Sequence, residues 1–251
     1  MKKGKVTVFR YDPTRDEQPY FEAHEFPFRP GIFVLDVANH IYEKIDGSFS
    51  FYSSCRNSHC GLCGAKINGK PGLMCREFAT QEMTLEPLSN ISVIRDLMID
   101  RQQYEETMGG LRLFLDRLKE PASQPEKIER EDLELFKVAS RCVECYACVS
   151  ICPAFEENRH EFLGPAGIVQ MSRHAVDPRD ELNREIVAHS AGVLNCTLCG
   201  KCNSVCPHGI APKTYVEILL SRLKEIGESL ENHLNLSQRA VLEQRGSENE
   251  K

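Results

Sequence analysis

Cysteine is the residue type in this sequence whose spacing could carry chemistry. The chain has 251 residues and 12 cysteines, and these fall into three groups of four with none left over. Thiolates at such spacings are the ligands of iron–sulfur clusters, whereas disulfides are typical of small secreted chains. The three groups are Cys55, Cys60, Cys63 and Cys75; Cys142, Cys145, Cys148 and Cys152; and Cys196, Cys199, Cys202 and Cys206.

The first group has the spacing C-x4-C-x2-C from Cys55, followed by a separate Cys75. This is the plant-type pattern for a [2Fe–2S] cluster. Gly61 and Gly64 lie beside the ligands, and glycine lets backbone N–H groups approach the sulfurs closely. A four-thiolate zinc site is the alternative, and the loop with its glycines favours iron.

The other two groups form an internal repeat, because residues 142–153 and 196–207 both have the spacing C-x2-C-x2-C-x3-C-P. Two copies predict a bacterial-type unit with two cuboidal clusters. Three closely spaced thiolates hold one cluster, and the fourth, beside proline, ligates the other. One cluster then takes Cys142, Cys145, Cys148 and Cys206. The other takes Cys152, Cys196 and Cys202, with Cys199 available as a fourth ligand.

The rest of the sequence offers no competing chemistry. His59 and His208 lie close to cysteines, and we interpret both as surface or packing residues. No G-x-G-x-x-G or P-loop motif indicates a nucleotide site. The net charge of −6 gives no broad attraction to nucleic acid. Apolar runs are too short to span a bilayer or to form a signal peptide, so we expect a cytoplasmic protein.

The elements around the first group predict a β-grasp module. Residues 1–10 alternate apolar and polar, as in a half-buried strand, and 21–28 form a second candidate strand. Apolar residues recur at helical spacing over 32–44. A strand is expected at 83–88 and a short helix around 93–98.

The second half is predicted to be mainly helical. The polar, proline-containing stretch 116–131 is an interdomain linker or a long surface loop, and helices joined by cysteine loops follow it. Residues 216–226 have a clear apolar helix face after Pro212. We predict an α+β chain with a [2Fe–2S] domain at 1–105, a helical two-cluster domain at 106–228 and a charged tail at 229–251.

One plant-type module followed by two bacterial-type runs resembles the iron–sulfur subunit of succinate dehydrogenases and quinol:fumarate reductases. The resemblance covers about residues 5–220. Segments 53–69 ("SSCRNSHCGLCGAKING"), 93–97 ("VIRDL") and 162–180 ("FLGPAGIVQMSRHAVDPRD") also match that family outside the cysteines.

The resemblance implies electron transfer without catalysis on this chain alone. Electrons would pass between FAD in a flavoprotein subunit and quinone or haem in a membrane subunit of cytochrome b type. The chain would lie on the cytoplasmic side of the inner membrane, held there by its partners. The third cluster would face the quinone, with Pro153, Phe155 and Thr197 nearby, although the sequence has no tryptophan for the quinone pocket of some relatives.

Two questions remain open at this point. The family commonly holds a [3Fe–4S] cluster in the third position, which leaves Cys199 unligated, whereas ligand counting predicts a second [4Fe–4S] cluster. We favour [3Fe–4S] here. The functional alternative is a subunit of another flavin oxidoreductase, of the thiol-linked fumarate reductase or glycolate or glycerol-3-phosphate dehydrogenase type. A free soluble electron carrier is a third possibility, of a different class.

Overall fold

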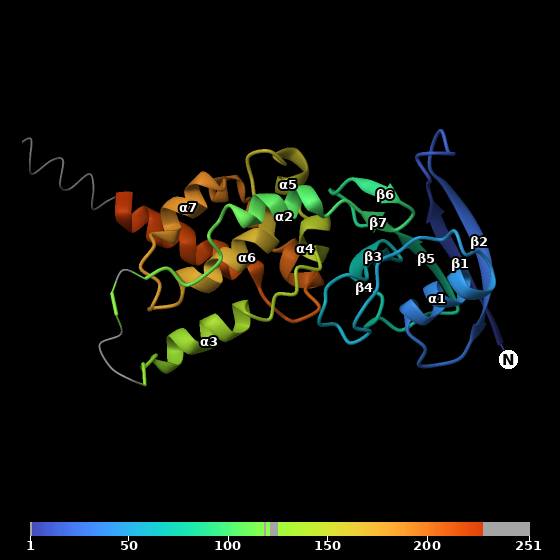
Figure 1. The fold of residues 1–251 in the computed structure, drawn as a ribbon, viewed down its shortest axis with the longest axis horizontal. Helices are drawn as coiled ribbons and strands as arrows, with labels where there is room; N and C mark the ends of the chain where they lie inside the picture. Colours follow the sequence, from blue (N-terminus) through green and yellow to red (C-terminus); the bar gives the residue numbers. More distant parts are fainter. Residues whose placement is uncertain (1, 118, 121–124, 228–251) are drawn as a thin grey trace, which may run out of the picture.

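Two lobes lie next to each other in the computed structural model, a sheet lobe at the N-terminal end and a helical lobe beyond it (Figure 1). The structure describes residues 2–117, 119–120 and 125–227. The predicted tail at 229–251 lies outside the described residues. The predicted α+β class, with the sheet first and the helices second, is confirmed.

The sheet lobe is a five-stranded mixed sheet in the order β2-β1-β5-β3-β4. Strand β1 pairs antiparallel with β2 and parallel with β5, which is the β-grasp arrangement. Helix α1 (Val34–Lys44) buries its apolar face in the sheet core. The predicted strands and helix are therefore confirmed. The strands are β1 (Lys2–Arg10), β2 (Tyr20–Phe28), β3 (Gly64–Ile67), β4 (Lys70–Leu73) and β5 (Glu82–Glu86).

The short helix predicted around residues 93–98 is wrong. Strands β6 (Val93–Arg95) and β7 (Met98–Ile99) form a small antiparallel hairpin there. Asp96, between them, has a left-handed φ of 46°. Its buried carboxylate accepts hydrogen bonds from Arg10 Nε at 3.1 Å and from the backbone N–H of Tyr11 at 3.0 Å. These contacts with the first strand fix the turn and override the local helical spacing.

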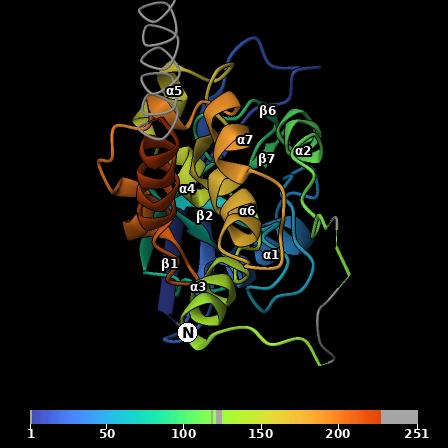
Figure 2. The ribbon, with the colours of Figure 1, turned by 90° about the vertical axis from the view of Figure 1, so that its left-hand side faces the viewer.

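The helical lobe confirms the prediction of helices joined by cysteine loops. Its final helix is described over 212–227 and runs beside α6 in both views (Figures 1 and 2). None of the helices in the described part of the chain is long and apolar enough to cross a membrane. The labelled elements are α2 (Gln102–Gly109), α3 (Arg130–Ala139), α4 (Ala147–Ser150), α5 (Pro153–Glu157), α6 (Gly164–Ala175), α7 (Arg184–Ser190), η1 (Val193–Asn195) and η2 (Lys201–Val205).

Helix α2 lies in the helical lobe, after the junction between the lobes. The boundary predicted at 105 falls inside this helix, whose Tyr104 is buried in the core of the helical lobe. The Tyr104 hydroxyl donates to the carbonyl oxygen of Leu163 at 2.7 Å and accepts from the N–H of Gly167 at 2.9 Å. Helix α2 thus packs with the helices that follow it, and the boundary near 105 stays a prediction.

Candidate iron–sulfur centres

The loop that begins at Cys55 directs backbone N–H groups at one sulfur. The N–H groups of Asn57, His59 and Cys60 donate to Cys55 Sγ at 3.3, 3.2 and 3.3 Å. Such donors favour the thiolate over the thiol. They lower the pKa of the Cys55 thiol to about 7, the N–H of Asn57 contributing most. The Cys55 thiol can therefore lose its proton and act as a metal ligand near neutral pH.

The other cysteines of the first group come from the sheet lobe. Cys63 directly precedes β3 and Cys75 follows β4, and both are buried in the sheet core. The N–H of Ser58 donates to Cys75 Sγ at 3.3 Å. Burial raises the pKa of the Cys63 thiol to about 12. Because metal ligands must be deprotonated, binding of a metal group here releases protons.

The second set of cysteines lines a cavity in the helical lobe. Cys142 and Cys145 lie in the loop that leads into α4, Cys148 lies within α4, and Cys206 follows η2. The ring of Tyr146 and the side chain of His208 also line this cavity. Burial raises the pKa of the Cys142 thiol to about 12 and that of the Cys145 thiol to about 11. The structure therefore brings together the predicted set Cys142, Cys145, Cys148 and Cys206.

The third set of sulfurs lines a separate cavity with Thr197 in its wall. Burial raises the pKa of the Cys202 thiol to about 11. Cys199 is exposed, and the N–H of Lys201 lowers the pKa of its thiol. Cys199 nevertheless lines the same cavity as the three predicted ligands. The cavity thus has four cysteines in its wall: Cys152, Cys196, Cys199 and Cys202.

The donor sets of all three sites fit iron–sulfur clusters. Each consists of four cysteine thiols, the donor set of [2Fe–2S] and [4Fe–4S] groups. Among the described residues, no three His, Cys, Asp or Glu side chains converge closely enough to hold a single metal ion. In the helical lobe, the thiols line two cavities, each with four cysteines in its wall.

The two glycines of the first loop have a role that differs from the expected one. The N–H donors described above come from other residues. Gly61 has a φ of +68°, and a Cβ there would lie 1.9 Å from the carbonyl oxygen of Val143. A Cβ on Gly64 would lie 2.9 Å from the carbonyl oxygen of Cys145. The glycines therefore let the first cysteine loop pack directly on the second one.

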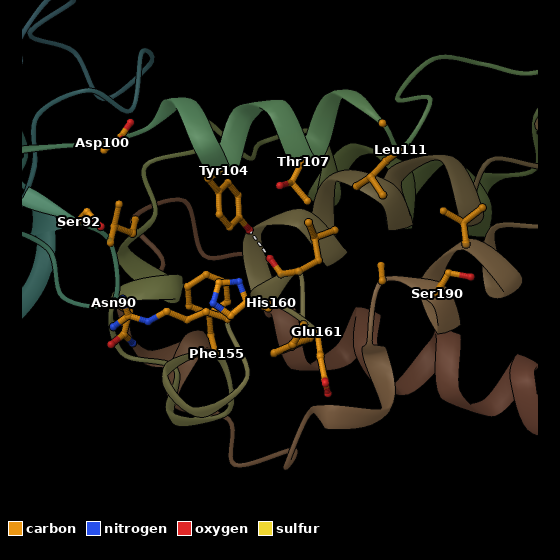
Figure 3. Close-up of a pocket in the computed structure, with 17 residues that line it drawn as sticks. Asn90, Ser92, Asp100, Tyr104, Thr107, Leu111, Phe155, His160, Glu161 and Ser190 are labelled. Carbon is orange, nitrogen blue, oxygen red and sulfur yellow. Dashed lines mark hydrogen bonds between the residues drawn. The ribbon is translucent and has the colours of Figure 1, made fainter.

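A cavity of about 640 Å³ lies beside these centres, between α2, α5 and α7. Figure 3 shows Tyr104 and Phe155 in its wall, with the hydrogen bond from the Tyr104 hydroxyl to Leu163. Phe155 is one of the residues that the resemblance places near quinone. Thr197 lines the third cysteine cavity instead, and Pro153 begins α5. Local patterns in the sequence did not predict this cavity, because its walls come from separate segments.

Comparison with protein families gives two matches. Residues 5–106 match the 2Fe-2S iron-sulfur cluster binding domain. Residues 138–210 match the 4Fe-4S dicluster domain. The chain thus has a [2Fe–2S] ferredoxin domain followed by a [4Fe–4S] dicluster domain, in agreement with the sequence prediction.

Comparisons over most of the chain give relatives among fumarate reductases. The fumarate reductase iron-sulfur subunit of Mycobacterium tuberculosis is 36% identical over 216 residues, which are 82% of this chain and 87% of the relative. A subunit of the fumarate reductase (CoM/CoB) of Methanothermobacter marburgensis is 36% identical over 202 residues, or 80% of this chain and 40% of the relative. The chain spans about half the length of three curated relatives that it matches.

A solved structure shares the fold. A chain of the Mycobacterium smegmatis Sdh1 complex in the apo form superposes with a TM-score of 0.80 at 24% identity. The match covers 89% of this chain and 96% of that chain. The 36% identity to the Mycobacterium tuberculosis subunit over most of both chains shows that the chain belongs to the family of fumarate reductase iron–sulfur subunits.

Proposed function

We propose that the chain is the electron-transfer subunit of a membrane-bound quinol:fumarate reductase or succinate:quinone oxidoreductase. The observation that carries this proposal is the packing of three four-cysteine sites along one chain, the first loop lying directly on the second. Its partners are an FAD-containing flavoprotein subunit and a membrane subunit of cytochrome b type that binds quinone. The family of the chain supports both partners.

The chain's residues hold and shield the redox groups. Bound iron–sulfur clusters accept and release single electrons. The proposed ligands of the [2Fe–2S] cluster are Cys55, Cys60, Cys63 and Cys75. Those of the [4Fe–4S] cluster are Cys142, Cys145, Cys148 and Cys206. The N–H groups around Cys55 stabilise negative charge on sulfur, and burial of the second set keeps water away from the ligands.

We also propose Cys199 as the fourth ligand of the third site, with Cys152, Cys196 and Cys202. Its place in the wall of their cavity favours a second [4Fe–4S] cluster over the [3Fe–4S] cluster that the family resemblance favours. Oxidised [3Fe–4S] is paramagnetic, whereas oxidised low-potential [4Fe–4S] gives no EPR signal. We expect a silent oxidised complex with about ten iron atoms per chain. A strong oxidised signal with about nine iron atoms would restore the [3Fe–4S] assignment.

The third site is proposed to face the membrane subunit. Phe155 lines the large cavity and Thr197 lines the third cysteine cavity, and Pro153 connects Cys152 to α5. These residues would therefore lie nearest the quinone. The chain would be peripheral, on the cytoplasmic side of the inner membrane, with its functional units at 1–105 and 106–228.

The test of the proposed function replaces Cys55 with serine in the purified complex. Cys55 is exposed, so the substitution leaves the sheet core intact. Fumarate reduction driven by quinol should stop, because electrons enter the flavoprotein through the first site. A reduced dye that donates directly to the flavin should still support fumarate reduction, which controls for an intact flavoprotein. Unchanged turnover with quinol would contradict the proposal.

A second candidate is the corresponding subunit of a thiol-linked fumarate reductase. The observation that favours it is the 36% identity to the Methanothermobacter marburgensis CoM/CoB protein over 80% of this chain. The electron donor that the complex uses to reduce fumarate distinguishes the two candidates. The purified native complex should reduce fumarate with a quinol and not with thiol coenzymes; reduction with thiols alone would support the second candidate.

A further inference from the structure

The two lobes share a hydrogen bond beside the first and second cysteine sites. His208 Nε2 lies 2.8 Å from the carbonyl oxygen of Ser58, in a part-buried contact between residues 150 positions apart. The carbonyl oxygen accepts, so Nε2 carries the proton in this pair. His208 follows Cys206 and Pro207 and lines the second cysteine cavity. The contact therefore joins the first cysteine loop to the segment that carries a ligand of the second site.

Ser58 links this contact to the first site as well. Its N–H donates to Cys75 Sγ at 3.3 Å, while its carbonyl oxygen meets His208. Ser58 has a left-handed φ of 56°, which is uncommon for a residue with a side chain. One residue in this conformation thus connects a sulfur of the first site to the second site through two hydrogen bonds.

The packing around Ser58 leaves this loop little freedom. Gly61, three residues on, faces the carbonyl oxygen of Val143 so closely that a Cβ would lie 1.9 Å from it. Cys145 packs against the core of the sheet lobe. The loop is therefore held between the two lobes at two points, the His208 hydrogen bond and the Gly61 contact.

We propose that His208 is a positioning residue for electron transfer between the first and second sites. By donating to the Ser58 carbonyl oxygen, it fixes the first cysteine loop at one distance and orientation from the second site. The role requires no titration of His208 and no bond change, because a single electron passes. The inference rests on the proposed electron-transfer function and assigns a specific residue to it.

The test compares His208→Phe with His208→Gln in the purified complex. Phenylalanine keeps the ring volume and loses the donor, whereas glutamine keeps an N–H donor. Magnetic broadening between the reduced first and second clusters reports their relative placement without any turnover. We expect His208→Phe to make displaced positions of the first loop about fivefold more populated, as expected for the loss of one such hydrogen bond. The broadening should therefore weaken and electron transfer between the sites should slow. His208→Gln should retain most of the broadening and most of the electron-transfer rate.

Two controls separate this effect from a general loss of structure. His189→Phe changes an exposed histidine on α7 and should leave the broadening as in the unaltered complex. Gly61→Ala and Gly69→Ala both place a side chain at positive φ, but a Cβ on Gly69 meets nothing within 4 Å. Gly61→Ala should weaken the broadening and Gly69→Ala should not. This pair tests whether displacement of the first loop alone weakens the broadening. If His208→Phe fails to assemble, His208→Leu, which also lacks the donor, takes its place.

Unchanged broadening and transfer rate in His208→Phe would overturn the inference, whatever the result with Gly61→Ala. Quinol-linked fumarate reduction that persists in those variants would leave the proposed function standing. Failure of the proposed function appears separately, as unchanged quinol-linked turnover in Cys55→Ser.

Discussion

At the scale of single residues, the sheet lobe depends on one buried charged pair. The side chain of Arg10 is 8% exposed and that of Asp96 is 2% exposed. Asp96 also accepts hydrogen bonds from the backbone N–H groups of Tyr11 and Ser50. Without Asp96, Arg10 would keep its ion pairs with Glu22 and Asp46. Its Nε–H and the two backbone N–H groups would lose their acceptor, and a buried donor without a partner is costly.

We therefore expect Asp96→Ala to lower the free energy of unfolding by about 3 kcal/mol or more, because three hydrogen-bond donors lose their acceptor at about 1–3 kcal/mol each. Urea unfolding followed by circular dichroism measures this change. The matched control is Glu25→Ala, because Glu25 pairs with Lys3 at the surface, where both side chains are mostly exposed. That substitution should cost less than about 1 kcal/mol. Equal costs for the two variants would show that burial of Asp96 does not matter.

A second residue-scale prediction concerns pH. His174 is buried near the end of α6. Burial, and after it the charges of Arg173 and Arg184, lowers the pKa of His174 below 6.5. The carboxylates of Asp180 and Asp177 act in the opposite direction. The unfolded chain then binds the proton at a higher pH than the folded one. The contribution of His174 to the free energy of unfolding is therefore complete above pH 6.5. It is lost as the pH falls from 6.5 toward the pKa of His174 in the folded chain.

The measurement is the thermal midpoint of the complex at about pH 7.5 and about pH 5.5, on either side of the ordinary histidine pKa. The midpoint should be higher at the upper pH. His174→Gln cannot be protonated, so the difference between the two pH values should shrink. An undiminished difference in the variant would assign the pH dependence to other groups.

At the scale of elements, α7 holds the segment that follows α2. Arg184, at the start of α7, donates to the carbonyl oxygens of Leu111, Arg112 and Phe114 at 3.1, 2.8 and 2.9 Å. Its charge is paired with Asp180 at 2.7 Å, and both side chains are 1% exposed. The buried guanidinium of Arg184 thus donates hydrogen bonds to three backbone carbonyl oxygens of a segment that has no regular secondary structure.

Replacement of Arg184 by methionine keeps the volume and removes all of these donors. We expect hydrogen exchange of the amides in 110–117 to become at least about tenfold faster, because loss of one partner of a buried pair costs several kcal/mol. Arg29→Met, at an exposed position before Pro30, is the control and should leave that exchange unchanged. Equal exchange in both variants would show that the segment is held by other contacts.

The sequence predicted some elements and not others for identifiable reasons. The cysteine sets were predictable because most ligands of each set lie within one short run, so that spacing alone nearly defines the geometry. The strand at Lys2–Arg10 was predictable from alternation. The hairpin around Asp96 was not, because the turn depends on Arg10, 86 residues away. Gly61 was noticed as a ligand neighbour, but its close contact with Val143 comes from the other lobe.

At the scale of the whole molecule, the chain has separate cores joined at the cysteine loops. One core lies in the sheet lobe and includes Cys63 and Cys75, whereas Cys152 lies in a core of the helical lobe. The second set lies next to the junction, since Val143 and Cys145 contact Gly61 and Gly64. The second site therefore adjoins the first, and we expect electrons to pass in the order first, second, third.

This order leads to a prediction about the complex. Cys60→Ser should remove the first site alone, because Cys60 is only partly buried and the second and third sets are formed without it. Dithionite, which reduces any accessible cluster, should still produce the EPR signals of the second and third clusters in the variant. Fumarate, which accepts electrons only through the flavoprotein, should then reoxidise these clusters in the unaltered complex and not in Cys60→Ser. Reoxidation of those clusters by fumarate at the unaltered rate in Cys60→Ser would mean that electrons bypass the first site.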